Sequence, residues 1–421
     1  MSEAEATQSH SFDWLARRPL AEVLALLNGG GEEARVVGGA VRNSLLREPP
    51  GDIDIATTAT PEEVTRRSLA AGFKAVPTGV EHGTVTIVAH GHPFEVTTLR
   101  EDVETFGRKA KVAFGRDWRA DAERRDFTIN ALSISPDGTV HDYVGGLPDL
   151  DARRVRFIGD PAKRIGEDYL RILRFFRFHA LYGNGGSDAA GLHACIAGRE
   201  GLRGLSRERV RMELFKLLVA PLAAPTLTIM SDAGLLPLVL GGVAQLASIE
   251  SLVRIEAATG AAPDPVRRLG ALAVLIEEDA ERLNDRLRLA NVEHRRLRLM
   301  AEGWRRLAPA ASEQDRRALL YRLGADSFAD RVLLAWARAG ADAGDEDWRT
   351  LASLPQRWRV PAFPLRAAAF MARGLAKGPA LGAAMHAAEE AWIAAGFPES
   401  RAEIEAIASR IAAPHRAKPA S

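Results

Sequence analysis

The sequence predicts an α+β protein in which a small mixed α/β head precedes a long all-helical region. Up to about residue 140, short β-branched runs such as GTVTIVAHG (83–91) alternate with helical segments. After residue 160 the pattern is rich in Ala, Leu and Arg, and no segment alternates in the way a strand does. The chain has 421 residues, which suits roughly two to four packed units rather than one core.

Four segments of the head are expected to be strands, because β-branched and aromatic residues recur in them. They are ARVVGG (34–39), DIDIAT (52–57), GTVTIVAHG (83–91) and HPFEVTTLR (92–100). The sequence GHP at 91–93 is typical of a tight turn, so the last two strands should form a hairpin. Helices are expected over 40–48 and 61–72, and Thr60-Pro61 is a typical start for the second. Residues 100–123 form a long charged connection.

Composition narrows the class of protein. The formal net charge is only +1, so any nucleic-acid site must be sought locally rather than in a global positive field. The single Cys195 excludes an intramolecular disulfide and a cysteine-rich metal cluster. Residues 1–10 lack the apolar segment of a signal peptide, and the uncharged run 233–249 is broken by Pro237 and glycines. We therefore expect a cytoplasmic protein without a membrane span.

The strongest chemical signal lies in VVGGAVRNSLLREPPGDIDIAT. Asp52 and Asp54 are two residues apart in an expected strand, so both should point to one face with Cα atoms about 6.6 Å apart. That spacing lets two carboxylates hold a pair of Mg²⁺ ions about 3.5–4 Å apart, as in two-metal phosphoryl transfer. An isolated Asp-X-Asp pair is usually only a solvated strand position. The order strand, Gly-Gly, helix, strand makes the catalytic interpretation stronger.

Three further parts of the head belong to the same hypothesis. Gly38 and Gly39 stand where a strand turns into a helix, and bare backbone N–H groups there would suit a triphosphate. Arg42 follows one turn into that helix. Glu95 alternates with its apolar neighbours, so it is either a third acid facing Asp52 and Asp54 or an exposed strand residue.

The segment GEDYLRILRFFRFHA (166–180) is the second signal. It sets Asp168, Arg171, Arg174 and Arg177 three residues apart on one face of an expected helix. An ordinary i,i+3 salt bridge is one interpretation of Asp168 and Arg171. The other is base selection, since cytosine and adenine both present an amino donor beside a ring-nitrogen acceptor. A carboxylate and a guanidinium match that edge, whereas guanine and uracil present the opposite pattern.

Five ordered motifs carry a resemblance to a known family. They are GGAVRN…GDIDIATTATP, PTGVEHGTVTIV, ERRDFTINAL, GEDYLRILRFFRF and LSRERVRMELFKLL. Together they resemble the class II tRNA nucleotidyltransferases, the CCA-adding enzymes of the polymerase-β-like nucleotidyltransferase superfamily. The similarity covers residues 34 to about 220, and only general helical similarity extends beyond it.

The resemblance implies an architecture and an activity. It implies a nucleotidyltransferase head (1–140), a nucleotide-selecting neck (141–220), a body (221–310) and a tRNA-binding tail (311–421). The implied reaction adds C, C and A to the tRNA 3′ acceptor end from CTP and ATP, without a nucleic-acid template. A poly(A) polymerase of the same family is the nearest alternative, and a non-catalytic RNA-binding protein on the same scaffold is another. The oligomeric state is not predicted.

The resemblance also assigns residues. It makes Asp52 and Asp54 the Mg²⁺ ligands. The implied nucleotide contacts are Gly39, Arg42, Arg125, Asp168, Arg171, Arg174 and Arg177. ERRDFTINAL, with Arg125 and Asp126 at an expected helix start, is implied to contact ribose and triphosphate. One departure from the family pattern is Asn43, where an aspartate is usual, and no specific role is assigned to it.

Overall fold

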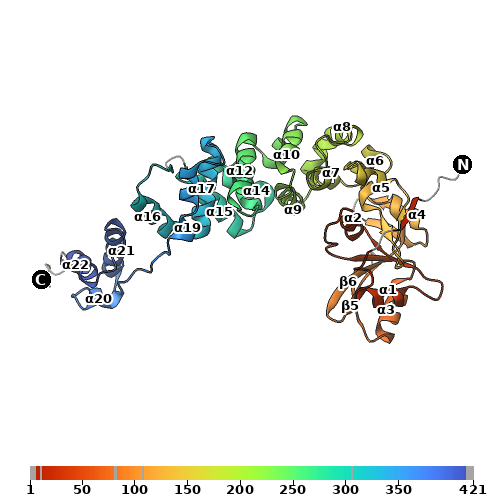
Figure 1. Ribbon diagram of the computed structural model, residues 1–421, viewed down its shortest axis with the longest axis horizontal. Coiled ribbons are helices and arrows are strands. Elements are labelled where there is room, and N and C mark those ends of the chain that lie inside the picture. The colour runs from red at the N-terminus through yellow and green to blue at the C-terminus, as the bar shows by residue number, and fades with distance from the viewer. Residues whose placement is uncertain (1–5, 10–11, 80–82, 107–108, 305–306, 414–421) are drawn as a thin grey trace. The chain divides into compact units, whose positions relative to one another are not determined.

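The computed structural model describes residues 6–9, 12–79, 83–106, 109–304 and 307–413 (Figure 1). The chain divides into two compact units, one of residues 1–244 with Asp285–Arg288 and one of residues 245–284 and 289–421. The first unit contains the strands, and the described residues of the second form helices and connecting segments without a strand. This confirms the predicted α+β class, whereas the finer four-part division stays a prediction.

The first unit is built on one eight-stranded mixed sheet. Across the sheet the strands are β1 (Ala6–Ser9), β10 (Thr139–Asp142), β9 (Ser133–Ile134), β2 (Ala34–Val37), β3 (Asp54–Thr57), β6 (His92–Thr98), β5 (Thr84–Ala89) and β4 (Lys74–Gly79). The β3–β6 pair is parallel and the other pairs are antiparallel. The strand that begins at Asp54 therefore has a neighbour on each side.

The four expected strands are present, with two corrections. In the hairpin between β5 and β6, the turn residues His90 and Gly91 have φ of 51° and 84°, the left-handed values of a tight hairpin turn. Strand β3 begins only at Asp54, so Asp52 lies in a bend before it, and the expected alternation of the two aspartates along one strand is wrong. The charged connection contains a two-stranded ribbon, β7 (Arg100–Phe106) with β8 (Lys109–Phe114).

The helices of the first unit follow local sequence signals. Helix α3 starts where Thr60 Oγ1 accepts a hydrogen bond from the Glu63 N–H at 3.4 Å. It packs against β4, β5 and β6, and α1 packs beside it (Figure 1). The helices are α1 (Leu20–Leu27), α2 (Gly39–Leu45), α3 (Pro61–Ala70), α4 (Trp118–Glu123), α5 (Gly146–Asp151), α6 (Pro161–Glu167), α7 (Leu170–Tyr182), α8 (Ala189–Gly198), α9 (Arg207–Leu218), α10 (Ala223–Asp232) and α11 (Leu236–Leu240). The short helices η2 (Thr128–Asn130) and η3 (Arg199–Gly204) are of the 3-10 type.

An aromatic cluster fixes α7 to the head. Phe127, just before η2, lies 4.7 Å from Phe157 and 5.3 Å from Phe178 between ring centroids, and Phe175 stacks on Phe157 at 5.5 Å. Phe127, Phe157 and Phe175 are fully buried. Each such ring contributes about 1.5–3 kcal/mol of burial. Helix α7 also packs against α9 and α10, so its polar stripe is held rigidly.

The second unit is helical. Its helices are α12 (Leu246–Thr259), α13 (Pro265–Ala273), most of α14 (Glu277–Leu287), α15 (Asn291–Ala301), α16 (Glu313–Leu323), α17 (Ala325–Ala339), α18 (Glu346–Ala352), α19 (Leu354–Arg357), α20 (Ala367–Met371), α21 (Pro379–Ala394) and α22 (Arg401–Ala412). Helix α17 is central and packs against α12, α13 and α15, with Trp336 fully buried. A separate core around Phe370 and Trp392 joins α20, α21 and α22.

Candidate active site

A cavity of about 640 Å³ opens between the head sheet and helix α7. We call it the first cavity. The predicted site residues that line it are Gly38, Gly39, Arg42, Asp54, Glu95, Arg125, Asp168, Arg171, Arg174 and Arg177. Asp52 is the exception, because it lines an adjoining second cavity together with Asp54 and Glu95. Residues separated by more than a hundred positions in the sequence thus meet at one place.

The carboxylates come together across two parallel strands. Asp54 on β3 is the register partner of Glu95 on β6, so the two side chains share one face of the sheet. Although Asp54 remains accessible from the cavity, desolvation and the nearby Glu95 carboxylate raise its pKa. Arg125 offsets part of that rise, and Asp52 adds to it. Desolvation of the Asp54 carboxylate is the main cause of its raised pKa, and the charge of Glu95 is the second.

The donor set fits a hard divalent cation. Carboxylate oxygens are the ligands that Mg²⁺ prefers, and it completes its shell with water and phosphate. The raised pKa of Asp54 indicates that a positive charge there would stabilise the ionised cluster. Within the described part of the chain, no group of three His, Cys, Asp or Glu side chains already converges as a metal cage. Two aspartates with substrate oxygens thus fit better than a complete protein cage.

The glycine turn has a different role from the expected one. Gly38 has φ of +71°, a conformation that favours glycine, and its N–H donates to the Leu132 carbonyl at 3.0 Å. The expectation of a bare N–H at Gly38 is therefore wrong, because this donor is used inside the fold. A Cβ at Gly38 would lie 3.4 Å from the Arg125 guanidinium. That distance is an ordinary van der Waals contact, so the positive φ at Gly38, rather than a lack of space, favours glycine at this turn.

Arg42 is a buried cation with neutral partners. Its guanidinium donates to Asn43 Oδ1 at 2.9 and 3.2 Å, to Tyr182 Oη at 2.7 Å and to Asn130 Oδ1. The ring of Tyr182 lies 4.1 Å below it. Burial lowers the pKa of Arg42, while Tyr182 acts in the opposite direction. These hydrogen-bond partners orient the charge without neutralising it, and Asn43 is one of them.

The segment ERRDFTINAL contributes several residues that line the first cavity. Arg125 pairs with Asp121 at 3.2 Å and donates to the Asn130 carbonyl at 3.3 Å. Asp126 follows the end of α4 and precedes only a 3-10 turn, so the expected helix start is wrong. Its Oδ1 accepts from the Phe127 N–H at 2.9 Å. Asp126 and Asn130 both line the cavity.

The helical conformation is interrupted between α6 and α7 at Asp168, the residue predicted to read the base. Asp168 is extended, with φ of −156°, and its Oδ1 caps Leu170 by accepting from its N–H at 3.1 Å. The expectation that Asp168 and Arg171 lie on one helix is therefore wrong, although both line the first cavity. Asp168 Oδ2 accepts from Arg209 at 2.5 Å, and Arg171 pairs with Glu167. The i,i+3 salt bridge is replaced by two separate pairs.

The remaining neck arginines are also held by carboxylates. Arg174 Nε donates to Asp126 Oδ2 at 2.6 Å, which connects α7 to the head. Arg177 forms an ion pair with Glu213 of α9 at 2.6 Å, and both side chains are largely buried. Burial lowers the pKa of Arg177, and Glu213 counteracts it. Both arginines lie over the Phe178 ring.

Sequence reasoning missed several residues of the cavity wall. Tyr182 ends α7 and holds Arg42, and Arg209 holds Asp168 from α9. Burial raises the pKa of the Asp168 carboxylate. The hydrogen bonds that it accepts from Arg209 and from the Leu170 N–H lower this pKa by more. The carboxylate therefore remains an ionised acceptor at neutral pH. Tyr182 could have been found from the sequence, because it follows Phe178 by four residues and so lies on the same face of the helix.

Two family models match the chain. The family described as "Poly A polymerase head domain" matches residues 34–156, and "Probable RNA and SrmB- binding site of polymerase A" matches residues 192–246. The human protein CCA tRNA nucleotidyltransferase 1, mitochondrial, is 34% identical over 401 residues, which cover 94% of this chain and 91% of that protein. The chain belongs to the CCA-adding tRNA nucleotidyltransferases. The family predicted from the motifs is thus confirmed.

Solved structures of CCA-adding enzymes share the fold. The Bacillus stearothermophilus CCA-adding enzyme in complex with CTP has a TM-score of 0.73 and 28% identity, covering 95% of this chain and 99% of that one. The Thermotoga maritima CCA-adding enzyme complexed with tRNA-CCA has a TM-score of 0.70 and 20% identity, covering 97% and 99%. As a CCA-adding nucleotidyltransferase, the chain is an enzyme, and these relatives support CCA addition rather than the poly(A) alternative or a silent RNA-binding protein.

Among the residues that the structure describes, none of the helices is both long enough and apolar enough to cross a bilayer. The cytoplasmic location stays a prediction.

Proposed function

We propose that this enzyme transfers CMP twice and AMP once from CTP and ATP to the 3′ end of tRNA, using the first cavity to hold the incoming nucleotide. The observation that carries the proposal is the convergence of two walls on one space. One wall holds carboxylates and Arg42, and the other holds Asp168 with the neck arginines. That is the division needed for a triphosphate at one end and a base at the other.

Base selection would depend on Asp168 and Arg171. A carboxylate accepts from the amino group of cytosine or adenine, and a guanidinium donates to the adjacent ring nitrogen. Guanine and uracil could make neither of these hydrogen bonds to the protein, at about 1–3 kcal/mol for each bond not made. Arg209 and Glu167 hold the two side chains in separate pairs, so neither neutralises the other. The fixed positions support selection without a nucleic-acid template.

Triphosphate binding would depend on Arg42 and Arg125. Arg42 is oriented by neutral side chains, so a phosphate would be its charge partner. Arg125 lines the same cavity, with its guanidinium next to Gly38. The resemblance of ERRDFTINAL to the family motif supports ribose contacts in the same cavity.

Asp52 and Asp54 would hold Mg²⁺, with Glu95 as a third acid beside them. When bound, the metal would lower the pKa of the tRNA 3′-hydroxyl and stabilise the leaving pyrophosphate. In the transfer, the 3′-oxygen bonds to the α-phosphorus and the bond from that phosphorus to the β-phosphate oxygen breaks. Pyrophosphate leaves and the hydroxyl proton passes to water. The protein's part is to hold Asp54 and Glu95 on one face of the sheet, with Asp52 in the bend just before β3.

The test is incorporation into tRNA that lacks CCA. Pure protein should add two C residues with CTP alone and complete CCA with CTP and ATP, whereas GTP and UTP should add nothing. Chelation with EDTA should abolish addition, and Mg²⁺ should restore it. The variant Asp54→Ala should lose activity by at least about a thousandfold while keeping its fold. Long A tracts from ATP alone would contradict the proposal and favour a poly(A) polymerase.

A further inference from the structure

The second cavity lies against the same carboxylates from another direction. Its volume is about 770 Å³, and Asp54 and Glu95 line both cavities. Asp52 lines the second cavity and is absent from the lining of the first. The carboxylate cluster is therefore reached from two spaces with different walls.

The reaction needs two substrates at this cluster. In phosphoryl transfer the attacking and leaving oxygens are roughly in line on opposite sides of the phosphorus. If the nucleotide occupies the first cavity, its pyrophosphate lies toward Arg42, and the attacking hydroxyl must come from another side. The second cavity is such an approach, because it ends at the same Asp54 and Glu95.

The walls of the second cavity carry groups suited to a nucleotide. Trp14 lines it, and within the described part of the chain its indole N–H is buried without a hydrogen-bond partner. A buried donor without a partner is costly, so a ligand acceptor there would stabilise it. The indole ring also offers a stacking surface for a base.

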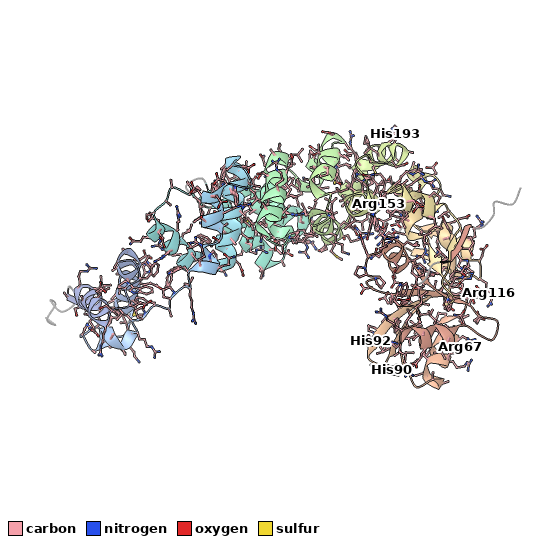
Figure 2. All side chains as sticks on the ribbon, in the orientation of Figure 1. Arg67, His90, His92, Arg116, Arg153 and His193 are labelled. Carbon is pink, nitrogen blue, oxygen red and sulfur yellow. The ribbon has the colours of Figure 1, made fainter. Side chains whose placement is uncertain are left out.

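Cations stand on the same wall. Arg17 and Arg18 line the cavity beside Trp14, and Arg18 is held by an ion pair with Glu22 of α1. His92, at the start of β6, lines it from the sheet side. Figure 2 shows His92 near His90 at the end of the β5–β6 hairpin. Phosphate groups of a single strand would contact the two arginines.

We propose that the second cavity receives the 3′-terminal nucleotide of the RNA, with Trp14 against its base and Arg17 on its phosphate. The terminal 3′-hydroxyl would then lie at Asp52 and Asp54, opposite the incoming nucleotide. This inference rests on the proposed function, since it assigns the acceptor substrate of the same reaction. A second nucleoside triphosphate in this cavity is the competing occupant, and the test separates the two.

The first measurement is photo-crosslinking of the full chain. A tRNA transcript without CCA, carrying 4-thiouridine at its 3′ end, is bound, irradiated and mapped by mass spectrometry of the crosslinked peptide. Crosslinks should fall in residues 12–19 or 92–95. Crosslinks to the α7 wall of the first cavity, with none in these segments, would overturn the inference. Because this readout needs no turnover, it is independent of the proposed reaction.

The second measurement is steady-state kinetics of variants. Trp14→Leu and Arg17→Gln should each raise the KM for tRNA, Trp14→Leu by about tenfold because a stacked base is lost, with the KM for CTP changed less than about twofold. Trp14→Phe should recover part of the loss through stacking alone. Arg66→Gln is the matched control, since Arg66 is an exposed arginine of α3 that lines neither cavity.

The outcomes are distinguishable. A rise in the KM for CTP with an unchanged KM for tRNA would mean that the cavity takes a nucleoside triphosphate, and the inference would be wrong. If wild-type protein added no nucleotide to tRNA, the proposed function would fail, whatever the crosslinks showed. Should Trp14→Leu fail to fold by circular dichroism, Arg17→Gln decides alone, because Arg17 is exposed.

Discussion

The arginines on the two walls of the first cavity have different hydrogen-bond partners. On the neck wall each arginine pairs with a carboxylate: Arg171 with Glu167, Arg174 with Asp126, Arg177 with Glu213 and Arg209 with Asp168. On the head wall, Arg42 is bonded to Asn43, Asn130 and Tyr182, which are all neutral. Both sets of guanidiniums are held in place, but the hydrogen-bond partners of Arg42 leave its charge unneutralised, whereas Arg125 on the same side pairs with Asp121 at 3.2 Å.

The difference matches two kinds of recognition. A base edge is neutral and is distinguished by the direction of hydrogen bonds, so an arginine that is already paired loses little as a reader. A triphosphate is strongly charged and is bound by charge, so an arginine with neutral partners is better suited to it. The contrast predicts that changes on the neck wall alter which nucleotide is used, and changes on the head wall alter how tightly any nucleotide binds.

The largest effect is expected for the double variant Asp168→Ala with Arg171→Ala. Two bonds that select C and A are lost, so discrimination of CTP over GTP should fall by roughly a hundredfold or more. Single-turnover incorporation with each nucleotide measures it. The control is Glu200→Ala with Arg203→Ala, an exposed acid–arginine pair of η3. Unchanged discrimination would show that the neck wall does not read bases.

The next effect concerns stability rather than selectivity. Glu213→Ala leaves Arg177 largely buried without its carboxylate, and we expect a loss of about 3 kcal/mol in the free energy of unfolding. Urea denaturation measures it. Glu208→Ala on the same helix removes an exposed partner of Arg288, and should cost less than about 1 kcal/mol. Equal losses in the two variants would contradict the buried character of the Arg177 pair.

A smaller effect is expected at the head wall. Arg42→Met should raise the KM for CTP and for ATP together, by about ten- to thirtyfold, because a charge-assisted bond to phosphate is lost. Discrimination against GTP should not change. Arg116→Met is the control, an exposed arginine paired with Glu32 that lines neither cavity (Figure 2). A change in selectivity at Arg42 would remove the distinction between the walls.

The smallest effect is expected for Asn43→Asp. A carboxylate beside Arg42 would compete with the triphosphate, but this side chain is partly exposed and its charge would be screened by solvent, so the KM for CTP should rise by less than about threefold. The melting temperature should rise slightly, since Arg42 gains a charge partner. A tenfold loss of affinity would instead mean that the neutral amide at Asn43 is essential.

Local patterns in the sequence predicted part of the head: strands β2, β3, β5 and β6 and helices α2 and α3 were expected, whereas strands β1, β4, β9 and β10 and helices α1 and α4 were not. The alternation in residues 84–89, the Thr60-Pro61 start and the glycine turn at His90-Gly91 are set by neighbouring residues, so they could be recognised without the fold. Two errors were also local. Asp52 lies before its strand, and Asp168 is a capping residue whose oxygen bonds two residues ahead, a typical signal for a helix start.

The partners of the site residues could not be predicted in the same way. Arg174 meets Asp126 across 48 positions, and Asp168 meets Arg209 across 41. Such pairs depend on how α7 packs against η2 and α9. This packing cannot be predicted from the spacing of residues within one segment of the sequence. The same holds for Trp14, whose place beside the carboxylates follows from the path of the N-terminal segment.

The shared carboxylates have a consequence for repeated addition. Asp54 and Glu95 border both cavities. A nucleotide that has just been joined to the RNA still lies in the first cavity, where it bound as a triphosphate. Before the next addition, the lengthened end must withdraw by one unit and reseat on the Trp14 side. Translocation past two fixed side chains would then be an obligatory stage of each cycle, with no template strand to pull it.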